Sequence, residues 1–444
     1  MKVTFVFILG LVGGCCSSPI LDSWMNNAKE GTKTEGGNIW AVLVAGSAGY
    51  SNYRHQADVC HLYQLLTKKH GISPQHVIVM MMNDIAYNRR NKTPGIIVNA
   101  LHGKDVYEGT IIDYMQRDVT PKNFLMILQG LRMGVGSMKT LGSGPNDYVF
   151  VNFVDHGDTG VLGFPNGELH LEDLQSTLNI MHQSGKYKQM LWYVEACFSG
   201  SMFESLSPNM NITAHTAANA YESSWACVFD QHRMVYLGDC WSLNWLNNTE
   251  QIYPRLYLET VEEQYEVVRN MTTTSHAMVY GDLDIIYHEN LSTFMGHSKG
   301  EYNNNEAAQM VNHLTDAIPA PDVLLATLRR RREGLYPELD EDLENEILYH
   351  EETEKRVQEV LEQIVMKMVK SEEMLAVFQE SRQSIGHPGC NKDVLGTFYE
   401  ACWGMQQHPY ITKYTYWISN LCNTYQSSGI VNAILTSCNS NGSQ

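Results

Sequence analysis

Two residues of this chain could bring a thiol and an imidazole to the same reaction. His156 stands in the stretch DHG and Cys197 in the stretch EAC, each directly after an apolar run. Thiol-dependent peptide cleavage needs a thiolate nucleophile, a histidine that protonates the leaving amine, and N–H donors for the oxyanion. Gly157, after the histidine, would let the backbone approach a substrate closely. A buried, inert cysteine fits the same apolar run, so the pair alone leaves both interpretations open.

The elements that must position this pair are predicted from alternating apolar and helical patterns. Helical patterns cover residues 55–70 and 171–182. Apolar runs typical of buried strands cover residues 39–46, 76–82, 147–157, 189–200 and 211–219. This alternation predicts β-α-β units, and therefore an α/β fold with a mainly parallel sheet and helices on both faces. Reactive residues of such sheets gather beyond the carboxyl ends of the strands, where His156 and Cys197 would meet.

Composition and charge indicate a globular protein of the secretory route. The chain has 444 residues and a formal net charge of −18, which argues against nucleic acid as a partner because phosphate binding needs a basic face. Residues 1–19 read as a signal peptide, with a buried first strand as the alternative, and residues 20–37 as a short N-terminal extension. No later stretch reaches the roughly 20 apolar residues of a membrane helix. Six N-x-S/T sequons support this route, although a proline close to the first argues against its use: Asn91, Asn211, Asn247, Asn270, Asn290 and Asn441.

The ten cysteines fall into three groups. Two leave with the signal peptide, and four more are scattered over the first 300 residues. The last four crowd the C-terminal end, which predicts two disulfides with three possible pairings: Cys390, Cys402, Cys422 and Cys438. Their spacing lacks the clustering of a zinc site, and we expect neither a metal nor a cofactor.

The sequence changes character after about residue 298. A polar, proline-marked stretch predicts a linker and activation peptide over residues 299–345, with four consecutive arginines at 329–332. Residues 333–362 hold twelve acidic and two basic side chains, and the apolar residues that follow have helical spacing. We therefore predict a helical, disulfide-containing unit over residues 346–444, beside an α/β domain over residues 38–298. The acidic helix could also be simply a solvated face.

Five longer stretches resemble the legumain, or asparaginyl endopeptidase, family of cysteine peptidases: AGSAGYSNYRHQADVCHLY, VDHGDTG, EACFSGSM, TAANAYESSWAC and YLGD. The resemblance runs in order through about residues 38–297 and loosely through the C-terminal region. It implies a caspase-like, mainly parallel six-stranded sheet flanked by helices. It also implies Cys197 as nucleophile, His156 as its partner, Asn52 as support for the imidazole, and the N–H groups of Cys197 and Gly157 as oxyanion donors.

The resemblance further implies a substrate pocket for asparagine. An asparagine side chain presents a carbonyl acceptor and an NH2 donor, so a selective pocket must offer a cation and carboxylates. Arg54 would donate, Glu195 and Asp239 would accept, and Ser223 would complete the wall. At low pH, a protonated aspartate would satisfy the same pocket. Without the resemblance, Arg54 and Asp239 would read as a buried structural ion pair.

For the C-terminal region, the resemblance implies a prodomain that caps the active site, with disulfides Cys390–Cys422 and Cys402–Cys438. We expect this cap to loosen as carboxylates protonate, giving acid-triggered self-activation. The family's cleavage asparagine after the basic patch is missing, so several sites remain open: Asn303, Asn304, Asn305, Asn312, Asn345, Asp340 and Asp342. Expected partners are protein and peptide substrates with asparagine before the cut bond, the chain's own prodomain, and inhibitors of the cystatin type. We expect a monomer, or a dimer as the zymogen, in a lysosome or other acidic vesicle, a gut lumen or the secreted fraction.

Phe198 departs from the family, which carries an acidic residue directly after the nucleophile. Loss of that charge favours the thiolate, and the ring could narrow the leaving side, so altered pH dependence or leaving-side preference is expected. A peptide ligase using the same acyl-enzyme is the first alternative function. A caspase or a membrane-anchored transamidase fits less well, since the chain has a signal peptide and no anchor. A non-catalytic, peptidase-like binding protein is the alternative of another class.

Overall fold

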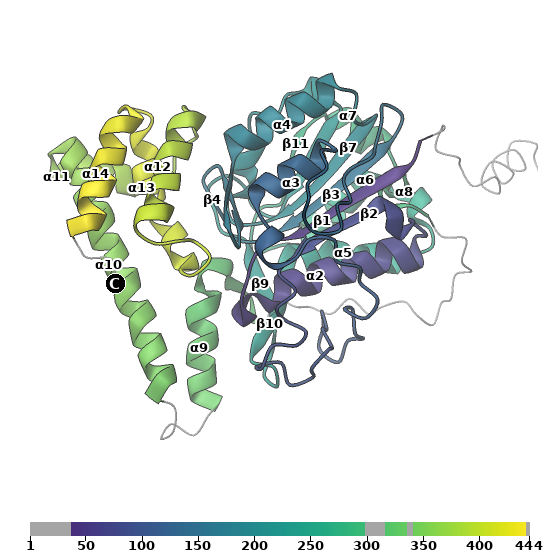
Figure 1. Cartoon of the computed structure of the whole chain (residues 1–444), viewed down its shortest axis with the longest axis horizontal. Helices are drawn as coiled ribbons and strands as arrows, with labels where there is room; N and C mark the ends of the chain where they lie inside the picture. Colours follow the sequence, from purple (N-terminus) through teal and green to yellow (C-terminus); the bar gives the residue numbers. More distant parts are fainter. Residues whose placement is uncertain (1–36, 298–315, 335–340, 441–444) are drawn as a thin grey trace, which may run out of the picture.

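The computed structural model describes residues 37–297, 316–334 and 341–440 of the chain. Its centre is a six-stranded sheet in which five neighbouring strands are parallel and the edge strand β11 is antiparallel (Figure 1). In spatial order the strands are β11 (Met278–Gly281), β8 (Ile212–Thr216), β7 (Gln189–Glu195), β3 (Tyr148–Val154), β1 (Ile39–Ala45) and β2 (Val77–Met81). The predicted mainly parallel sheet is confirmed, and β11 is the strand for which we had no sequence prediction.

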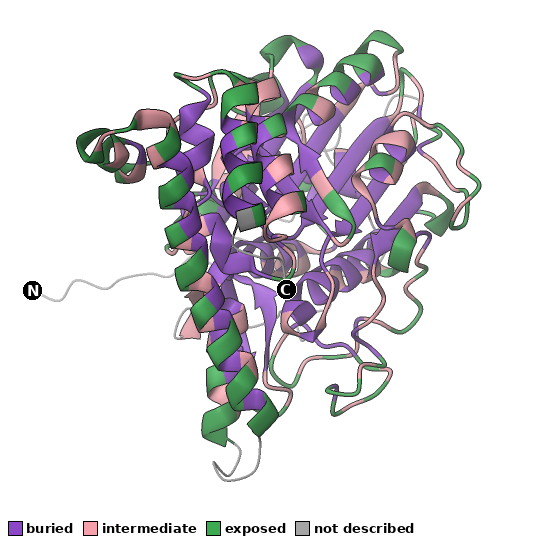
Figure 2. Ribbon diagram, turned by 60° about the vertical axis from the view of Figure 1, so that its left-hand side comes forward, coloured by how far each residue is buried: buried purple, intermediate pink, exposed green. Residues whose placement is uncertain are grey.

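Helices cover both faces of this sheet because the strands bury apolar side chains on both sides. In β1, Ala41, Leu43 and Ala45 face one core and Val42 and Val44 face the other. The helices that pack on the first face are α2 (Tyr53–Gln64), α5 (Cys240–Ile252), α6 (Val261–Met271), α7 (Leu283–His288) and α8 (Leu291–Met295). Those on the second face are α3 (Pro121–Leu128) and α4 (Leu171–Gln183). The central strands are buried along their length (Figure 2).

Two small sheets lie at the edge where the parallel strands end. One is β10–β9–β12, made of Val235–Asp239, Trp225–Asp230 and Ile318–Pro319. The other is β4–β5–β6, made of Gly157–Asp158, Val161–Phe164 and Gly167–His170. A short 3-10 turn, η5 (Ser199–Met202), follows the nucleophile segment. These small sheets build the surroundings of the predicted site.

The C-terminal unit is helical, as predicted. It contains α9 (Val323–Gly334), α10 (Glu341–Val369), α11 (Glu372–Glu380), α12 (Pro388–Ala401), α13 (Tyr416–Leu421) and α14 (Ser427–Ser440). The long helix α10 carries an exposed stripe and a buried stripe, which is the amphipathic pattern read from the sequence (Figure 2). None of the helices in the described ranges is long and apolar enough to cross a membrane.

The stretch predicted as linker and activation peptide contains a short strand and a helix in its described residues. Within residues 299–345, β12 pairs with β9, and α9 lies beside α10 (Figure 1). Arg329 and Arg332 of α9 bind Glu351 and Glu344 of α10 at 2.7 and 3.4 Å. The four-arginine run is therefore one half of a charged helix pair, because the acidic stretch that follows folds back onto it.

Candidate active site

The two predicted strand ends lie side by side. Strands β3 and β7 are parallel, with Val154 opposite Glu195, and the N–H of Asp155 donates to the carbonyl of Glu195 at 3.0 Å. A side chain on Gly157 would place its Cβ 2.4 Å from the carbonyl oxygen of Cys197. Only glycine permits this approach. The chain therefore brings the segments of His156 and Cys197 together at the carboxyl edge of the sheet.

The imidazole of His156 is held by Asn52. Asn52 Oδ1 lies 2.9 Å from His156 Nε2, and Asn52 Nδ2 donates to the carbonyl of Ala48 at 2.9 Å. The ring of His55 stands edge-on to that of His156, with centroids 5.2 Å apart. Burial, and then the nearby Arg54, hold the pKa of His156 well below its usual value. The imidazole is therefore neutral, with one ring nitrogen bound to Asn52 and the other left for proton transfer.

The thiol of Cys197 is shielded in this state. The residue is 1% exposed, and burial raises the pKa of the thiol to about 11, while hydrogen bonds from Ser224 and Ser223 lower it. Within the described residues, Sγ makes its hydrogen bond with Ser224 Oγ at 3.6 Å rather than with His156. A protonated, covered thiol is a poor nucleophile, so the described state is a latent one.

The residues expected to bind asparagine form one buried group, apart from Ser223, which lies beside the thiol. Arg54 Nε donates to Asp239 Oδ1 at 2.7 Å, and Glu195 Oε2 accepts from the N–H and hydroxyl of Ser242 at 2.9 and 3.0 Å. Three polar atoms in this group have no hydrogen-bond partner among the described residues: Arg54 Nη2, Glu195 Oε1 and Asp239 Oδ2. Buried polar atoms are normally paired, so one donor and two acceptors left over together point to a ligand.

This buried group contains more carboxyl groups than cations. Asp58, Glu195 and Asp239 are each at most 2% exposed, and Arg54 is the cation placed among them. Burial first, and then the charge of Asp239, raise the pKa values of Asp58 and Glu195 well above their usual range. Burial also raises the pKa of Asp239, against the effect of Arg54. Strongly shifted carboxyls that surround one cation are typical of a functional site.

A segment from beyond the α/β domain covers the thiol. Strand β12 runs antiparallel to β9, with Ile318 opposite Ala226. The N–H of Ala320 then donates to the carbonyl of Ser224 at 2.9 Å. Ala320 is 1% exposed and packs against Cys197 and Phe198, and Pro321 follows it directly. Residues 318–320 thus lie as an added strand beside Cys197.

The helical unit closes the other side. Gln406 Nε2 donates to Asp155 Oδ2 at 2.7 Å, and Asn391 Nδ2 donates to the carbonyl of Thr159 at 2.8 Å. Arg382 Nη1 donates to Asp158 Oδ1 at 2.9 Å. These contacts fall on the residues immediately around His156, so the C-terminal unit caps the site.

Sequence profiles of the Peptidase C13 family and of the legumain prodomain match residues 39–297 and 341–438, respectively. The chain belongs to the peptidase C13 family. Legumain of Homo sapiens is 40% identical over 395 residues, which cover 87% of this chain and 90% of the human protein. Hemoglobinase of Schistosoma japonicum is 38% identical over 404 residues, covering 89% of this chain and 92% of that protein. The vacuolar-processing enzyme of Citrus sinensis is 36% identical over 413 residues, covering 87% and 82%.

Among solved structures, caspase-1 from Spodoptera frugiperda aligns with 60% of this chain and 94% of its own, at 10% identity and a TM-score of 0.35. A likeness of this size adds nothing to the family assignment. The C13 match and the legumain relatives identify the chain as a cysteine endopeptidase with a C-terminal prodomain.

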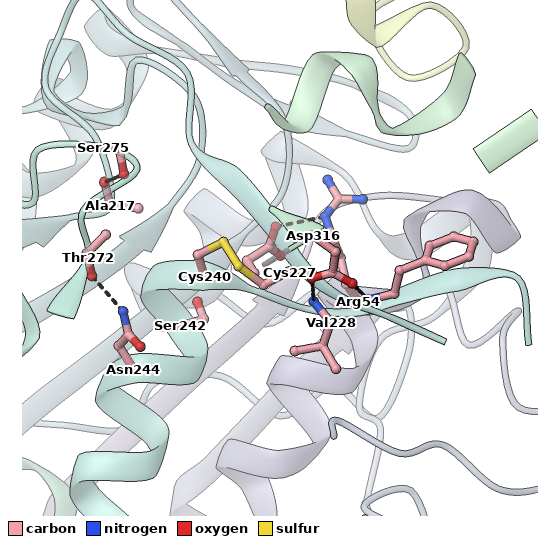
Figure 3. The surroundings of a disulfide bond; sticks show 12 residues. Arg54, Ala217, Cys227, Val228, Cys240, Ser242, Asn244, Thr272, Ser275 and Asp316 are labelled. Carbon is pink, nitrogen blue, oxygen red and sulfur yellow. Dashed lines mark hydrogen bonds and ion pairs between the residues drawn. A yellow bond between two sulfur atoms is a disulfide. The ribbon is translucent and has the colours of Figure 1, made fainter. Parts of the chain in front are cut away.

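Three disulfides stabilise the described part of this C13 peptidase. Cys390–Cys422 and Cys402–Cys438 lie in the prodomain, with the pairing that the resemblance implied. A third, Cys227–Cys240, joins β9 to the start of α5 next to Arg54 and Ser242 (Figure 3). Cys227 and Cys240 belong to the scattered cysteines for which the sequence predicted no pairing. The free cysteines among the described residues are Cys60 and Cys197.

The asparagines predicted to carry glycans differ in how exposed they are. Asn211 and Asn270 are exposed, and Asn247 and Asn290 are half-buried. Asn91 is 3% exposed and its Nδ2 donates to the carbonyls of Ala86 and Ile96, both at 3.0 Å. A glycan on that nitrogen would replace one of the two hydrogens that make these bonds, so this geometry argues against glycosylation of Asn91, which stays a prediction. Asn441 lies outside the described residues.

The activation-site candidates are mostly outside the described residues as well: Asn303, Asn304, Asn305, Asn312 and Asp340. Asp342 and Asn345 are within the first turns of α10. The signal peptide and nearly all of the N-terminal extension precede the described residues. The choice of cleavage site stays a prediction.

Sequence reasoning missed several residues of the site. Ser224 touches the thiol, Ser242 orients Glu195, and His55 stands between His156 and Asp239, with its Nε2 3.7 Å from Asp239 Oδ2. Ser224 and His55 lie inside the stretches quoted for the resemblance, which is the signal that could have found them. Arg382 and Ala320 carried no such signal, because their roles depend on how the C-terminal unit docks.

Proposed function

We propose that this C13 peptidase cleaves peptide bonds after asparagine and is made as a zymogen. The observation that carries the proposal is the set of unpaired buried atoms around Arg54. A carboxamide could accept from Arg54 Nη2 and donate to Glu195 Oε1 and Asp239 Oδ2. A residue without this pattern would leave buried polar atoms unpaired, at a cost of about 1–3 kcal/mol each. The predicted roles of Arg54, Glu195 and Asp239 are thus supported, with Ser223 nearer the thiol than the sequence suggested.

The proposed reaction proceeds through an acyl-enzyme. His156 first takes the proton of the Cys197 thiol, and the resulting thiolate attacks the carbonyl carbon of the asparagine residue, while the N–H groups of Cys197 and Gly157 stabilise the oxyanion. His156 gives a proton to the leaving amine as the carbon–nitrogen bond breaks. Water then attacks the thioester, which releases the carboxylic acid and restores the thiol. The contact with Asn52 keeps His156 oriented for both proton transfers.

Cleavage after aspartate is expected only at acidic pH. A protonated aspartate offers a hydroxyl donor and a carbonyl acceptor in place of the amide, whereas an ionised one would meet the carboxyls of Glu195 and Asp239. The raised pKa values of these two groups make a protonated pocket attainable in mild acid. The ratio of asparagine to aspartate cleavage should therefore fall as the pH falls.

The zymogen is kept inactive by residues 318–321, which occupy the site as an added strand that the enzyme cannot cleave. If Ala320 takes the place of the substrate's asparagine, its methyl group cannot pair with Arg54 or Glu195. Pro321 would then supply the leaving group, and its ring removes the N–H and restrains the backbone. Residues 318–321 thus bind beside the nucleophile in the manner of a substrate but lack the features needed for cleavage.

Acid-triggered release of the cap is supported by its ion pairs. Among the described residues, the pairs that join the peptidase domain to the cap are Asp173–Lys392 at 2.6 Å, Asp158–Arg382 at 2.9 Å and Glu346–Arg90 at 3.8 Å, and their attraction requires ionised carboxylates. Glu168 opposes this, because burial and then the charge of Glu400 raise its pKa to about 7. A titration of the zymogen from neutral pH to about pH 4 tests the idea. A zymogen that stays intact and inactive throughout would contradict it.

The decisive test of the activity uses acid-treated protein and an Ala-Ala-Asn fluorogenic peptide, with Cys197→Ser as control. Cleavage by the wild type alone supports the proposal, and equal activity in both proteins refutes it. Product analysis with an added amine nucleophile separates hydrolysis from ligation, because both reactions share the acyl-enzyme. We place the enzyme in an acidic compartment of the secretory route, a gut lumen or the secreted fraction, in line with the name of the Citrus relative, a vacuolar-processing enzyme.

A further inference from the structure

The side chain of Arg382, from the prodomain, binds in a site of the peptidase domain formed by Asp158, Thr159 and Phe198. Its side chain is 6% exposed and comes from the connection between α11 and α12. Nη1 donates to Asp158 Oδ1 at 2.9 Å and to Thr159 Oγ1 at 2.7 Å. The guanidinium carbon lies 3.4 Å from the centroid of the Phe198 ring. A carboxylate, a hydroxyl and an aromatic face thus surround one guanidinium, which is the set of contacts that suits arginine best.

The peptidase side of this site is held in place by its own backbone. Phe198 has a left-handed backbone with φ of 54°, its N–H donates to the carbonyl of Glu222 at 2.8 Å, and its carbonyl accepts from Ser201 Oγ at 2.6 Å. The N–H of Thr159 donates to Asp158 Oδ1 at 2.7 Å. A non-glycine residue in this conformation persists only where its surroundings hold it. The backbone of Phe198 and one hydrogen bond of Asp158 are therefore fixed within the peptidase domain.

Asp158 depends on the prodomain for most of its donors. Besides Arg382, its Oδ2 accepts from Tyr399 Oη at 2.7 Å and from Thr415 Oγ1. Both come from the prodomain, as does Arg382, so departure of the cap removes three donors from a carboxylate that is fully buried in the zymogen. One N–H, from Thr159, would remain. A carboxylate in that position, two residues after His156, would bind a cation from the next peptide that enters.

The direction of strand β12 indicates which part of a bound substrate would reach the site of Arg382. Strand β12 runs antiparallel to β9 and leads to Ala320, which packs against Cys197. Two residues further on, Asp322 Oδ1 accepts from Lys413 Nζ at 2.8 Å. The neighbouring carbonyl of Thr412 accepts a hydrogen bond from Arg382 Nη2. The Arg382 site therefore lies on the side toward which the chain proceeds after the nucleophile. For a substrate bound in the same direction, this is the leaving-group side.

We propose that Asp158, Thr159 and Phe198 form a leaving-side subsite that selects an arginine side chain of the substrate, and that Arg382 fills this subsite in the zymogen. The inference rests on the proposed asparagine-directed activity and adds a second specificity element to it. Phe198 supplies the stacking surface, and Asp158 supplies the charge next to it. Lysine gains less, because its ammonium cannot stack flat on the ring or bind two acceptors through a planar fork.

The first test uses the activated wild-type enzyme and needs no variant. Quenched fluorescent peptides carry Ala-Ala-Asn, followed by arginine, lysine or citrulline at the first, second or third position after the asparagine. Citrulline keeps the shape of arginine without its charge. We expect kcat/KM for arginine to exceed that for citrulline about tenfold at one position, with lysine between them. Ratios near one at all three positions overturn the subsite. No cleavage of any peptide refutes the proposed function and the subsite with it.

Variants locate the effect. Asp158→Asn should bring the arginine-to-citrulline ratio close to one, and Phe198→Leu should lower it severalfold. Asp173→Asn is the matched control, because Asp173 also binds a prodomain cation, Lys392 at 2.6 Å, but on helix α4. Its ratio should equal that of the wild type. An undiminished ratio in Asp158→Asn would overturn the assignment.

If Asp158→Asn does not fold, competition in the wild type decides. A synthetic peptide of residues 380–385, Glu-Ser-Arg-Gln-Ser-Ile, should inhibit the activated enzyme severalfold better than its citrulline form. Equal inhibition constants for the two peptides would contradict the subsite.

Discussion

Asn52 Oδ1 lies 2.9 Å from His156 Nε2, so the imidazole is held by a residue of the 3-10 turn directly before α2, while the histidine itself lies between β3 and β4. Asn52 Oδ1 also lies 3.5 Å from Arg54 Nη1. A single amide thus touches both His156, the proposed proton-transfer residue, and Arg54, the cation of the proposed pocket. With those roles, this shared contact would couple the orientation of the general acid to the position of the substrate side chain.

Replacement of Asn52 by alanine should lower kcat by about two orders of magnitude, because a misplaced imidazole loses its alignment with the leaving amine. KM should rise less, since Arg54 keeps its bond to Asp239. Asn52→Asp restores an acceptor and adds charge, so the pH–rate profile should shift toward a higher imidazole pKa. Steady-state kinetics at several pH values check both variants. Wild-type kcat in Asn52→Ala, with an unchanged melting temperature, would contradict this role.

The thiol of Cys197 should be unreactive in the zymogen and reactive after the prodomain is removed. Burial raises its pKa to about 11, so little thiolate exists at neutral pH while the cap is bound. Iodoacetamide labelling at pH 7.5 should be at least about a hundredfold faster in the activated enzyme. Cys60 is the internal control, because burial also raises its pKa, to about 12, and its position in α2 is independent of the cap. Equal labelling rates of Cys197 in the two forms would refute shielding by the cap.

Glu168→Gln should stabilise the zymogen at neutral pH and not in acid. Burial and the like charge of Glu400 raise the pKa of Glu168 to about 7. A raised carboxyl pKa means that the group adds stability at low pH and loses it as the pH rises through about 7. Glutamine never carries the charge, so the gain at pH 7.5 should be about 1 kcal/mol and vanish near pH 4.5. Thermal unfolding at both pH values checks this, and Asp173→Asn should instead lower stability at pH 7.5.

Removal of the Cys227–Cys240 disulfide should destabilise the peptidase domain and weaken substrate binding. The bridge spans 13 residues, a loop for which about 3 kcal/mol is typical. Cys240 follows Asp239 directly, and Cys227 lies on β9, beside which the activation segment binds. The double variant Cys227→Ala, Cys240→Ala should therefore melt at a lower temperature and show a higher KM for Ala-Ala-Asn peptides. Cys60→Ala is the control for loss of a buried sulfur. An unchanged KM would mean that the bridge is purely structural.

Much of the fold was predictable from local patterns. Apolar runs at residues 39–46, 76–82 and 147–157 match β1, β2 and β3, because strands buried on both faces need continuous apolar side chains. The antiparallel edge strand β11 was not predicted, since four half-buried residues leave no periodic signal. The ordered part of the expected linker was missed for another reason. Its strand β12 exists only because β9 offers an open edge.

What the sequence alone determined is the chemistry. The long stretches around His156 and Cys197 identify the family and predict the nucleophile and the carboxyl edge of the sheet, because each is a run of neighbouring residues. Only the tertiary structure decided which distant residues meet there. Ser224 lies against the thiol, Ala320 covers it, and Arg382 sits between Asp158 and Phe198. These pairings join segments far apart in the chain, and a contact of that kind depends on the packing of whole domains rather than on any local pattern.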